Sequence, residues 1–107
     1  MKIIWTAQAL QDLLLAREHI EMDNKVAAAR IANRLSVAAK RLANHPEVGR
    51  PGRVDSTREL VVTSTPYLLP YRVREGRVEL LAVIHGALRN GRNSFEYVKF
   101  YIRSATG

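Results

Sequence analysis

Apolar residues recur along this chain with two different periods, which divide it into a helical first half and a strand-rich second half. The run KIIW at residues 2–5 is too short for a helix and rich in isoleucine and tryptophan, so it predicts a buried strand. Thr6 is a suitable N-cap, and apolar residues then recur at steps of three and four from Leu10 to Ile20. This spacing predicts an amphipathic helix that begins at Ala7.

A second amphipathic helix is predicted after the short turn EMDNK at residues 21–25. Asn24 can cap it, and Pro46 ends it because the residue before a proline avoids helical geometry. Two helices joined by so short a turn are expected to pack antiparallel. The residues that fall on the solvated side of the second helix are Lys25, Arg30, Arg34 and Arg41.

Three strand-like runs follow, RELVVT, YLLPYRVR and RVELLAVIH, and together they predict an antiparallel β-meander. If Glu75 and Gly76 form a two-residue hairpin loop, counting outward sets the register of the last two strands. The resulting pairs are Arg74 with Arg77, Val73 with Val78, Arg72 with Glu79, Tyr71 with Leu80, and Leu69 with Ala82.

A four-residue loop from Ser64 to Tyr67 would set the register of the first two strands in the same way. That loop pairs Val62 with Leu69, Leu60 with Tyr71, and Glu59 with Arg72. Arg72 would then lie between Glu59 and Glu79, and opposite charges on neighbouring strands stabilise a sheet without any ligand. A structural role is therefore expected for Arg72.

The alternation along the strands assigns one face of the meander to the helices and leaves the reverse face without a cover. The helix-facing positions are Leu69, Tyr71, Val73, Val78, Leu80, Ala82 and Ile84. The reverse face is mixed, and its apolar members need a cover because a large apolar patch is rarely left in water. Either a partner peptide or the aromatic tail at residues 91–107, itself readable as a helix or a strand, could supply that cover.

Composition and charge narrow the function further. With 107 residues, 47% of them hydrophobic, the chain is expected to form one core, and no apolar run reaches the about 18 residues needed to span a bilayer. The N-terminus lacks the pattern of a secretory leader, so we expect a cytoplasmic protein. Without cysteine, and with only three scattered histidines, neither a metal nor another cofactor is expected. A net charge of +7 favours a nucleic acid, the ribosome or an acidic protein as partner.

The stretch GRPGRVDSTREL at residues 49–60 concentrates positive charge at the entrance to the first strand of the meander. Pro51 and its flanking glycines favour turn conformations, from which Arg50 and Arg53 extend. Arg58 enters the sheet beside Glu59, where a local structural role is as plausible as recognition. We expect this loop to attract a partner, since binding residues are often placed on loops.

Six segments in this order resemble the RelE/ParE superfamily of bacterial toxins from type II toxin–antitoxin modules. They are IIWTAQALQDL, AAARIANRL, LANHPEVGRPGR, TREL, PYLLPYRV and VELLAVIHGALR, which run from the N-terminus to about Arg89. The resemblance implies an α+β fold: an N-terminal strand, an antiparallel two-helix hairpin and a three-stranded antiparallel meander with the helices on one face. It implies one toxin domain at residues 1–90, to which the tail at 91–107 is expected to pack. It also implies an acidic antitoxin as partner.

The superfamily divides into ribosome-dependent mRNA endoribonucleases of the RelE branch and DNA gyrase poisons of the ParE branch. The nuclease branch commonly has arginine where this chain has Leu68, and tyrosine where an approximate alignment places Phe95. These departures favour a ParE-like, non-enzymatic gyrase poison. A nuclease remains the alternative, with His85 as proton carrier, and an inactive or purely binding descendant is a third possibility. The credible residues for a nuclease are Arg58, Arg72, His85 and Arg89.

For the favoured function, no catalytic residue is expected, and the predicted contacts to the target and the antitoxin combine loop arginines with the reverse face. They are Arg50, Arg53, Arg58, Val61, Leu68, Leu81, Val83 and Arg89.

Overall fold

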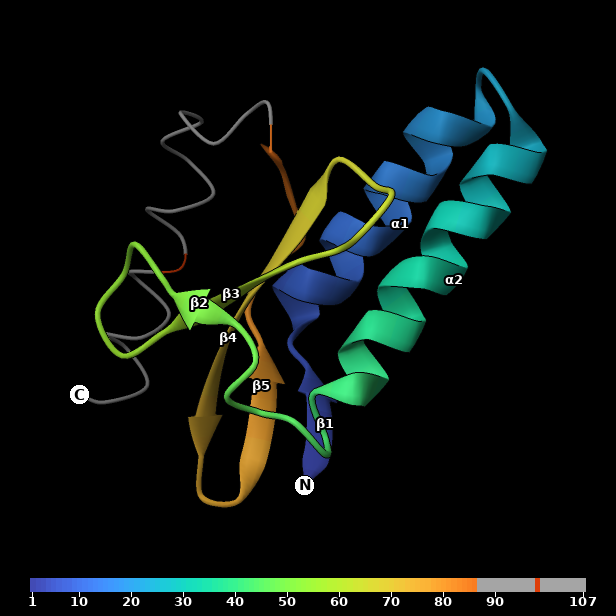
Figure 1. The fold of residues 1–107 in the computed structure, drawn as a ribbon. Coiled ribbons are helices and arrows are strands. Elements are labelled where there is room, and N and C mark those ends of the chain that lie inside the picture. The colour runs from blue at the N-terminus through green and yellow to red at the C-terminus, as the bar shows by residue number, and fades with distance from the viewer. Residues whose placement is uncertain (87–97, 99–107) are drawn as a thin grey trace.

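The computed structural model of the chain describes residues 1–86 and Val98. Within these residues a six-stranded sheet is covered on one side by two antiparallel helices (Figure 1). The predicted α+β fold is confirmed. In chain order, the elements are β1 (Lys2–Trp5), α1 (Ala7–Glu21), α2 (Lys25–Arg41), β2 (Arg50–Pro51), β3 (Arg58–Val61), β4 (Tyr67–Arg74), β5 (Arg77–Leu80) and β6 (Ile84–His85).

Both helices begin at the predicted caps. The Thr6 hydroxyl oxygen accepts a hydrogen bond from the Ala9 N–H at 3.2 Å, and the Asn24 side-chain oxygen accepts one from the Ala27 N–H at 3.0 Å. These bonds satisfy backbone donors that have no partner within the helix.

The strand order is β1-β5-β4-β3-β2, and β6 pairs with β4. β1 lies parallel to β5, whereas the other pairs are antiparallel. The arrangement places β1 at one edge of the sheet, and β3 with the two-residue β2 at the other.

The hairpin between β4 and β5 has the predicted register. Tyr71 pairs with Leu80, and the ladder continues to Arg74 and Arg77 at the turn. Glu75 and Gly76 have φ angles of 53° and 73°, the left-handed conformation that a type I′ hairpin turn requires at both positions.

Beyond Leu80 the predicted pairing of Leu69 with Ala82 is wrong, because one extra residue enters the ladder. β6 pairs Leu68 with Ile84, so two residues of β4 face three residues of the opposing chain. Pro70 explains the interruption, since proline has no N–H to donate and is tolerated within a sheet only at edges and bulges. Its carbonyl accepts the Leu81 N–H at 2.9 Å, while the Leu81 carbonyl accepts a bond from the Thr6 hydroxyl at 3.4 Å.

This bulge exchanges the two faces for the residues that follow it, because side chains alternate along a strand. Val83 packs in the core beneath the helices, whereas Ala82 and Ile84, predicted to face the helices, lie in a second apolar cluster with Leu68. Val73 was also predicted to face the helix core, yet it is exposed.

The predicted register between β3 and β4 is wrong by two residues. Leu60 pairs with Leu69, and Glu59 with Pro70, because the turn closes earlier, where the Val62 N–H donates to the Tyr67 carbonyl at 3.1 Å. Ser64 takes the left-handed conformation in this turn, with φ 64°. An even shift leaves every side chain on its predicted face.

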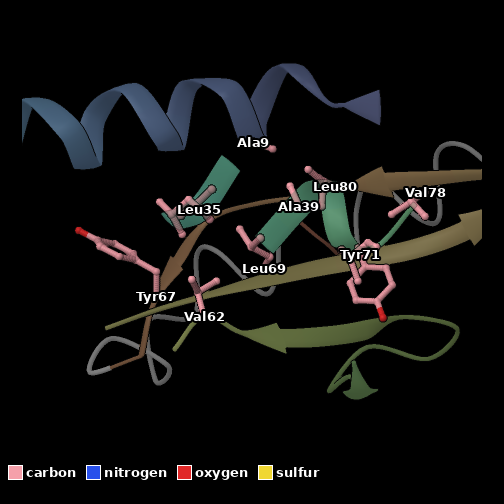
Figure 2. Packing of buried hydrophobic residues seen from close by; sticks show 11 residues of the cluster. Ala9, Leu35, Ala39, Val62, Tyr67, Leu69, Tyr71, Val78 and Leu80 are labelled. Carbon is pink, nitrogen blue, oxygen red and sulfur yellow. The ribbon is translucent and has the colours of Figure 1, made fainter. Parts of the chain in front are cut away.

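The core lies between the helices and the sheet. Figure 2 shows Leu35 and Ala39 of α2 close to Leu69 and Leu80 of the sheet, with the ring of Tyr71 nearby. Each of these side chains is buried, and burying a leucine side chain contributes about 1.5–3 kcal/mol to stability. The core therefore holds β4, the central strand, firmly against the helices.

We predict that Thr6→Val destabilises the fold by about 1–2 kcal/mol, because it removes both the cap of α1 and the donor to the Leu81 carbonyl at the bulge. Urea unfolding followed by circular dichroism measures the change. Thr6→Ser keeps the hydroxyl and serves as the matched control. Equal stability of the valine and serine variants would contradict the structural role of this hydroxyl.

Candidate functional site: the basic loop and the arginine face of α2

A buried carboxylate fastens the basic loop to the sheet. Glu59 of β3 is 4% exposed, and its two oxygens accept bonds from Arg50 Nη2 at 3.2 Å and from the Arg53 backbone N–H at 3.1 Å. Burying a carboxylate is costly unless it is paired and hydrogen-bonded, and Glu59 is both. The Arg50 side chain remains 57% exposed, so it can contact a partner while it holds the loop.

The loop itself is a compact turn. The Gly52 N–H donates to the Thr57 carbonyl at 2.9 Å, and the Thr57 N–H donates to the Val54 carbonyl at 3.2 Å. A Cβ at Gly52 would overlap the Thr57 hydroxyl oxygen, so glycine suits the close approach of these two residues across the turn. Val54, inside the turn, is buried in the second apolar cluster.

Tyr71 and Arg58 clamp the segment that leads from α2 to β2. The Tyr71 hydroxyl donates to the Pro46 carbonyl at 2.7 Å and accepts from the Gly49 N–H at 2.9 Å. Arg58 Nη1 donates to the Gly49 carbonyl at 2.8 Å and to the Glu47 carbonyl at 3.3 Å. Arg58 therefore has the structural role weighed for it from the sequence, with backbone carbonyls as its partners.

Arg72 is occupied by its predicted cross-strand partner. Its Nε lies 2.5 Å from Glu79 Oε1, and both residues are buried. A buried pair of this kind holds the guanidinium in place, because separating the charges would leave each of them unpaired in a poorly polarisable interior. Glu59, the other neighbour predicted for Arg72, forms an ion pair with Arg50.

His85 lies at the far end of the sheet from Arg58. It pairs with Tyr67, whose ring it meets edge to face at a centroid distance of 5.3 Å, whereas Arg58 pairs with Tyr71 four residues along the same strand. Four residues of a strand span about 13 Å. Arg58 and Arg72 both line a hollow of about 330 Å³ beside Pro51 and Thr57. The structure therefore brings these two arginines together and leaves His85 apart from them, and Arg89 lies outside the described residues.

The expected apolar contact face is already buried within the chain. Leu68 and Leu81 are 5% and 1% exposed and share a cluster with Val54 and Val98, while Val83 faces the helices. The expectation that these three side chains form an uncovered surface is therefore wrong. Val61, at 54% exposure, is the one apolar contact candidate from the sequence that is open to solvent among the described residues.

The cover of that face comes partly from the tail, since Val98 is almost fully buried beside Leu81 and Ile84. The other tail residues lie outside the described residues. The expected domain boundary at residue 90 falls there too. Val54, a loop residue, supplies further cover.

The sequence reasoning missed a groove beside α2. A hollow of about 380 Å³ separates the exposed side of this helix from the end of β3. Its lining is Arg30, Asn33, Arg34, Val37, Ala38, Arg41, Val62 and Thr63. Helical spacing placed Arg30, Arg34 and Arg41 on one side of α2, and that shared side was the available signal.

In the part of the chain that the structure describes, no cluster of three acidic, histidine or cysteine residues could hold a metal ion. Within the same residues no helix is both long and apolar enough to cross a membrane.

We predict that Glu59→Gln loosens the basic loop, because the neutral amide no longer attracts Arg50 and offers only one acceptor oxygen. The free energy of unfolding should fall by about 1–3 kcal/mol, and amide exchange at Arg53 should accelerate. Glu75→Gln is the matched control, since Glu75 is exposed and its ion pair with Arg77 contributes little. Unchanged exchange at Arg53 would show that Glu59 does not hold the loop.

Burial raises the pKa of the Tyr71 hydroxyl, although the Gly49 bond and the charge of Arg58 oppose this. An unfolded tyrosine ionises near pH 10, and the folded Tyr71 ionises later, so stability is complete below about pH 10 and falls as the pH rises above it. Tyr71→Phe should cost about 1–3 kcal/mol at pH 7 and should lose less further stability in alkali than the parent chain. Urea titrations at pH 7 and pH 11 test this, and identical alkaline losses would contradict it. Tyr67, whose pKa burial also raises, contributes equally to both proteins.

Comparison with known proteins agrees with this architecture. A family model described as the ParE toxin of the type II toxin–antitoxin system parDE matches residues 3–88. Y4kP of Sinorhizobium fredii is 46% identical over 84 residues, which cover 78% of this chain and 86% of that protein. Toxin RelE2 of Caulobacter vibrioides is 41% identical over 86 residues, covering 80% of this chain and 96% of the relative.

A solved structure of the chromosomal ParDE toxin–antitoxin system from P. aeruginosa has the same fold. The TM-score is 0.72 at 24% identity, over 79% of this chain and 95% of that one. From its fold and these matches, the chain belongs to the ParE family of toxins from type II toxin–antitoxin systems.

Proposed function

We propose that this chain is a toxin that arrests growth by binding and poisoning DNA gyrase in the cytoplasm, without chemistry of its own, and that an acidic antitoxin neutralises it. The observation that carries the proposal is that the side chains a nuclease would need are engaged within the chain, with His85 at the opposite end of β4 from Arg58 and Arg72. Arg72 is bound to buried Glu79, Arg58 is bound to loop carbonyls, and His85 packs on Tyr67.

Cleavage of RNA through its 2′-hydroxyl requires a proton acceptor, a proton donor and a cation that meet around one phosphate. Arg58 and His85 diverge from such a point, and Arg72 would first have to leave its carboxylate. Binding alone makes no such demand on geometry. The basic surface suits a target that carries acidic groups or works on DNA.

The charge balance also supports an acidic antitoxin. Seventeen lysines and arginines against ten acidic residues leave +7, and the described carboxylates Glu59 and Glu79 are already engaged by arginines. A partner rich in carboxylates would associate fast and would lower the electrostatic self-repulsion of the toxin.

We predict that the purified chain inhibits supercoiling by gyrase and leaves ribosome-bound mRNA intact. His85→Ala should keep this inhibition within about twofold, because a poison that acts by binding needs no proton carrier. His19→Ala, at an exposed helix position, is the matched control. A supercoiling assay and a reconstituted translation assay supply the two readings.

Transcript cleavage on ribosomes that His85→Ala abolishes would contradict the proposal and establish the nuclease alternative. Inactivity in both assays would indicate a chain that has kept the fold and lost the toxicity.

A further inference from the structure

The outer edge of the sheet is only partly covered. β2 pairs with Arg58 and Glu59, and the described residues provide no partner strand for the rest of β3. The Val62 N–H points inward to the Tyr67 carbonyl, and backbone groups alternate in direction along a strand. The N–H and carbonyl of Val61 therefore point outward, along an edge that can accept another strand.

This open edge borders a continuous groove. Beside the larger hollow lies a second one of about 110 Å³, between the end of α2 and β3. The second hollow is lined mostly by apolar residues, including exposed Val48 and Val61. The two hollows share Ala38, Arg41, Val62 and Thr63, so they form one groove with an apolar end and a basic wall.

The basic wall runs along the groove, and part of it matches the spacing of an extended peptide. Arg30 and Arg34 are one helical turn apart, a rise of about 6 Å, and Arg41 lies about 16 Å from Arg30 along the axis. Alternate side chains on one side of a β-strand are about 6.6 Å apart, which matches the rise from Arg30 to Arg34 and not the longer rise to Arg41. In the described part of the chain, none of these three arginines forms an ion pair.

We propose that this groove binds an acidic segment of the antitoxin as an added β-strand along the outer edge of β3. Backbone hydrogen bonds form at Val61, carboxylates of the segment face Arg30, Arg34 and Arg41, and its apolar side chains pack against Val48 and Val61. The identity of the occupant rests on the proposed function. The mode of binding rests on the open edge, the apolar floor and the unpaired arginines.

A nucleic acid would use the same arginines but not the rest of the groove. Phosphates gain nothing from an open strand edge or from an apolar floor, whereas a peptide uses both. The combination therefore favours a peptide, and duplex DNA serves as a competitor in the test.

The probe is a fluorescein-labelled ten-residue peptide in which glutamate alternates with valine or threonine, and fluorescence anisotropy with the full chain measures its binding. Arg34→Gln and Arg41→Gln should each weaken binding about fivefold to tenfold and reduce its salt dependence. Lys40→Gln removes the same charge from the same helix outside the groove and should change affinity by less than about twofold.

Val61→Pro removes the outward N–H and leaves the inward ladder to β4 intact, so binding should fall at least about tenfold. Val61→Thr keeps the N–H and should bind like the parent chain. If the proline variant fails to fold, a peptide N-methylated at alternate residues tests the same hydrogen bonds from the ligand side. Tight binding of the N-methylated peptide would overturn the inference.

Two further results would also overturn it: equal binding of a scrambled peptide of the same composition, or complete displacement by duplex DNA at equal charge concentration. Failure of the toxin function is separable. If the chain binds the probe through Val61 and Arg34 but does not inhibit gyrase, the proposed gyrase function is wrong and the peptide-binding groove is retained. If the antitoxin still neutralises the toxicity of the Val61→Pro variant, the proposed binding mode in the groove is wrong and the gyrase function is retained.

Discussion

Tyr71 and Arg58 fix the backbone of residues 46–49 by hydrogen bonds. The position of this segment determines how much of the outer sheet edge is left open. The ring of Tyr71 is buried in the core, and its hydroxyl bonds to the Pro46 carbonyl and the Gly49 N–H, while Arg58 bonds to the Gly49 carbonyl. A Cβ at Gly49 would lie 2.5 Å from that hydroxyl oxygen, so the chain passes here at the closest possible approach. Because this segment is fixed, β2 pairs only with Arg58 and Glu59, the first two residues of β3. The rest of the β3 edge stays open.

The charges divide into two groups with different roles. On the reverse face, Glu59 and Glu79 are buried and each holds an arginine, so these guanidinium groups order the loop and the sheet. On α2, Arg30, Arg34 and Arg41 surround a hollow and form no ion pair within the described residues. Because Glu59 and Glu79 pair with other arginines, the arginines at the groove keep their positive charge. A partner with acidic groups can neutralise that charge.

Much of the fold could be predicted from sequence because local rules determine it. Thr6 and Asn24 cap the helices, and Glu75-Gly76 sets the register of the hairpin between β4 and β5. The bulge opposite Pro70 could not be predicted, because the effect of a missing N–H depends on which neighbour that N–H would face. The open apolar face was a wrong expectation for a similar reason: alternation shows that Leu68 and Leu81 share a face, but not that Val54 and Val98 cover it.

The candidate site was only partly visible in the sequence. The loop arginines were found, yet their attachment to Glu59 depends on the pairing of β2 with β3. The arginines of α2 were assigned to solvent, because periodicity shows which side of a helix leaves the core and not what lies beside it. Here the neighbour is the open end of β3, which turns a solvated helix face into one wall of a groove.

Residue-resolved amide exchange of the whole toxin, alone and bound to its cognate antitoxin, tests the open-edge account most directly. If the antitoxin pairs with this edge, strong new protection is expected at Val61, whose N–H points outward, with little change at inward-facing Val62, already bonded to Tyr67. Protection confined to Leu68 and Leu81, with Val61 exchanging as freely as in the isolated toxin, would contradict it.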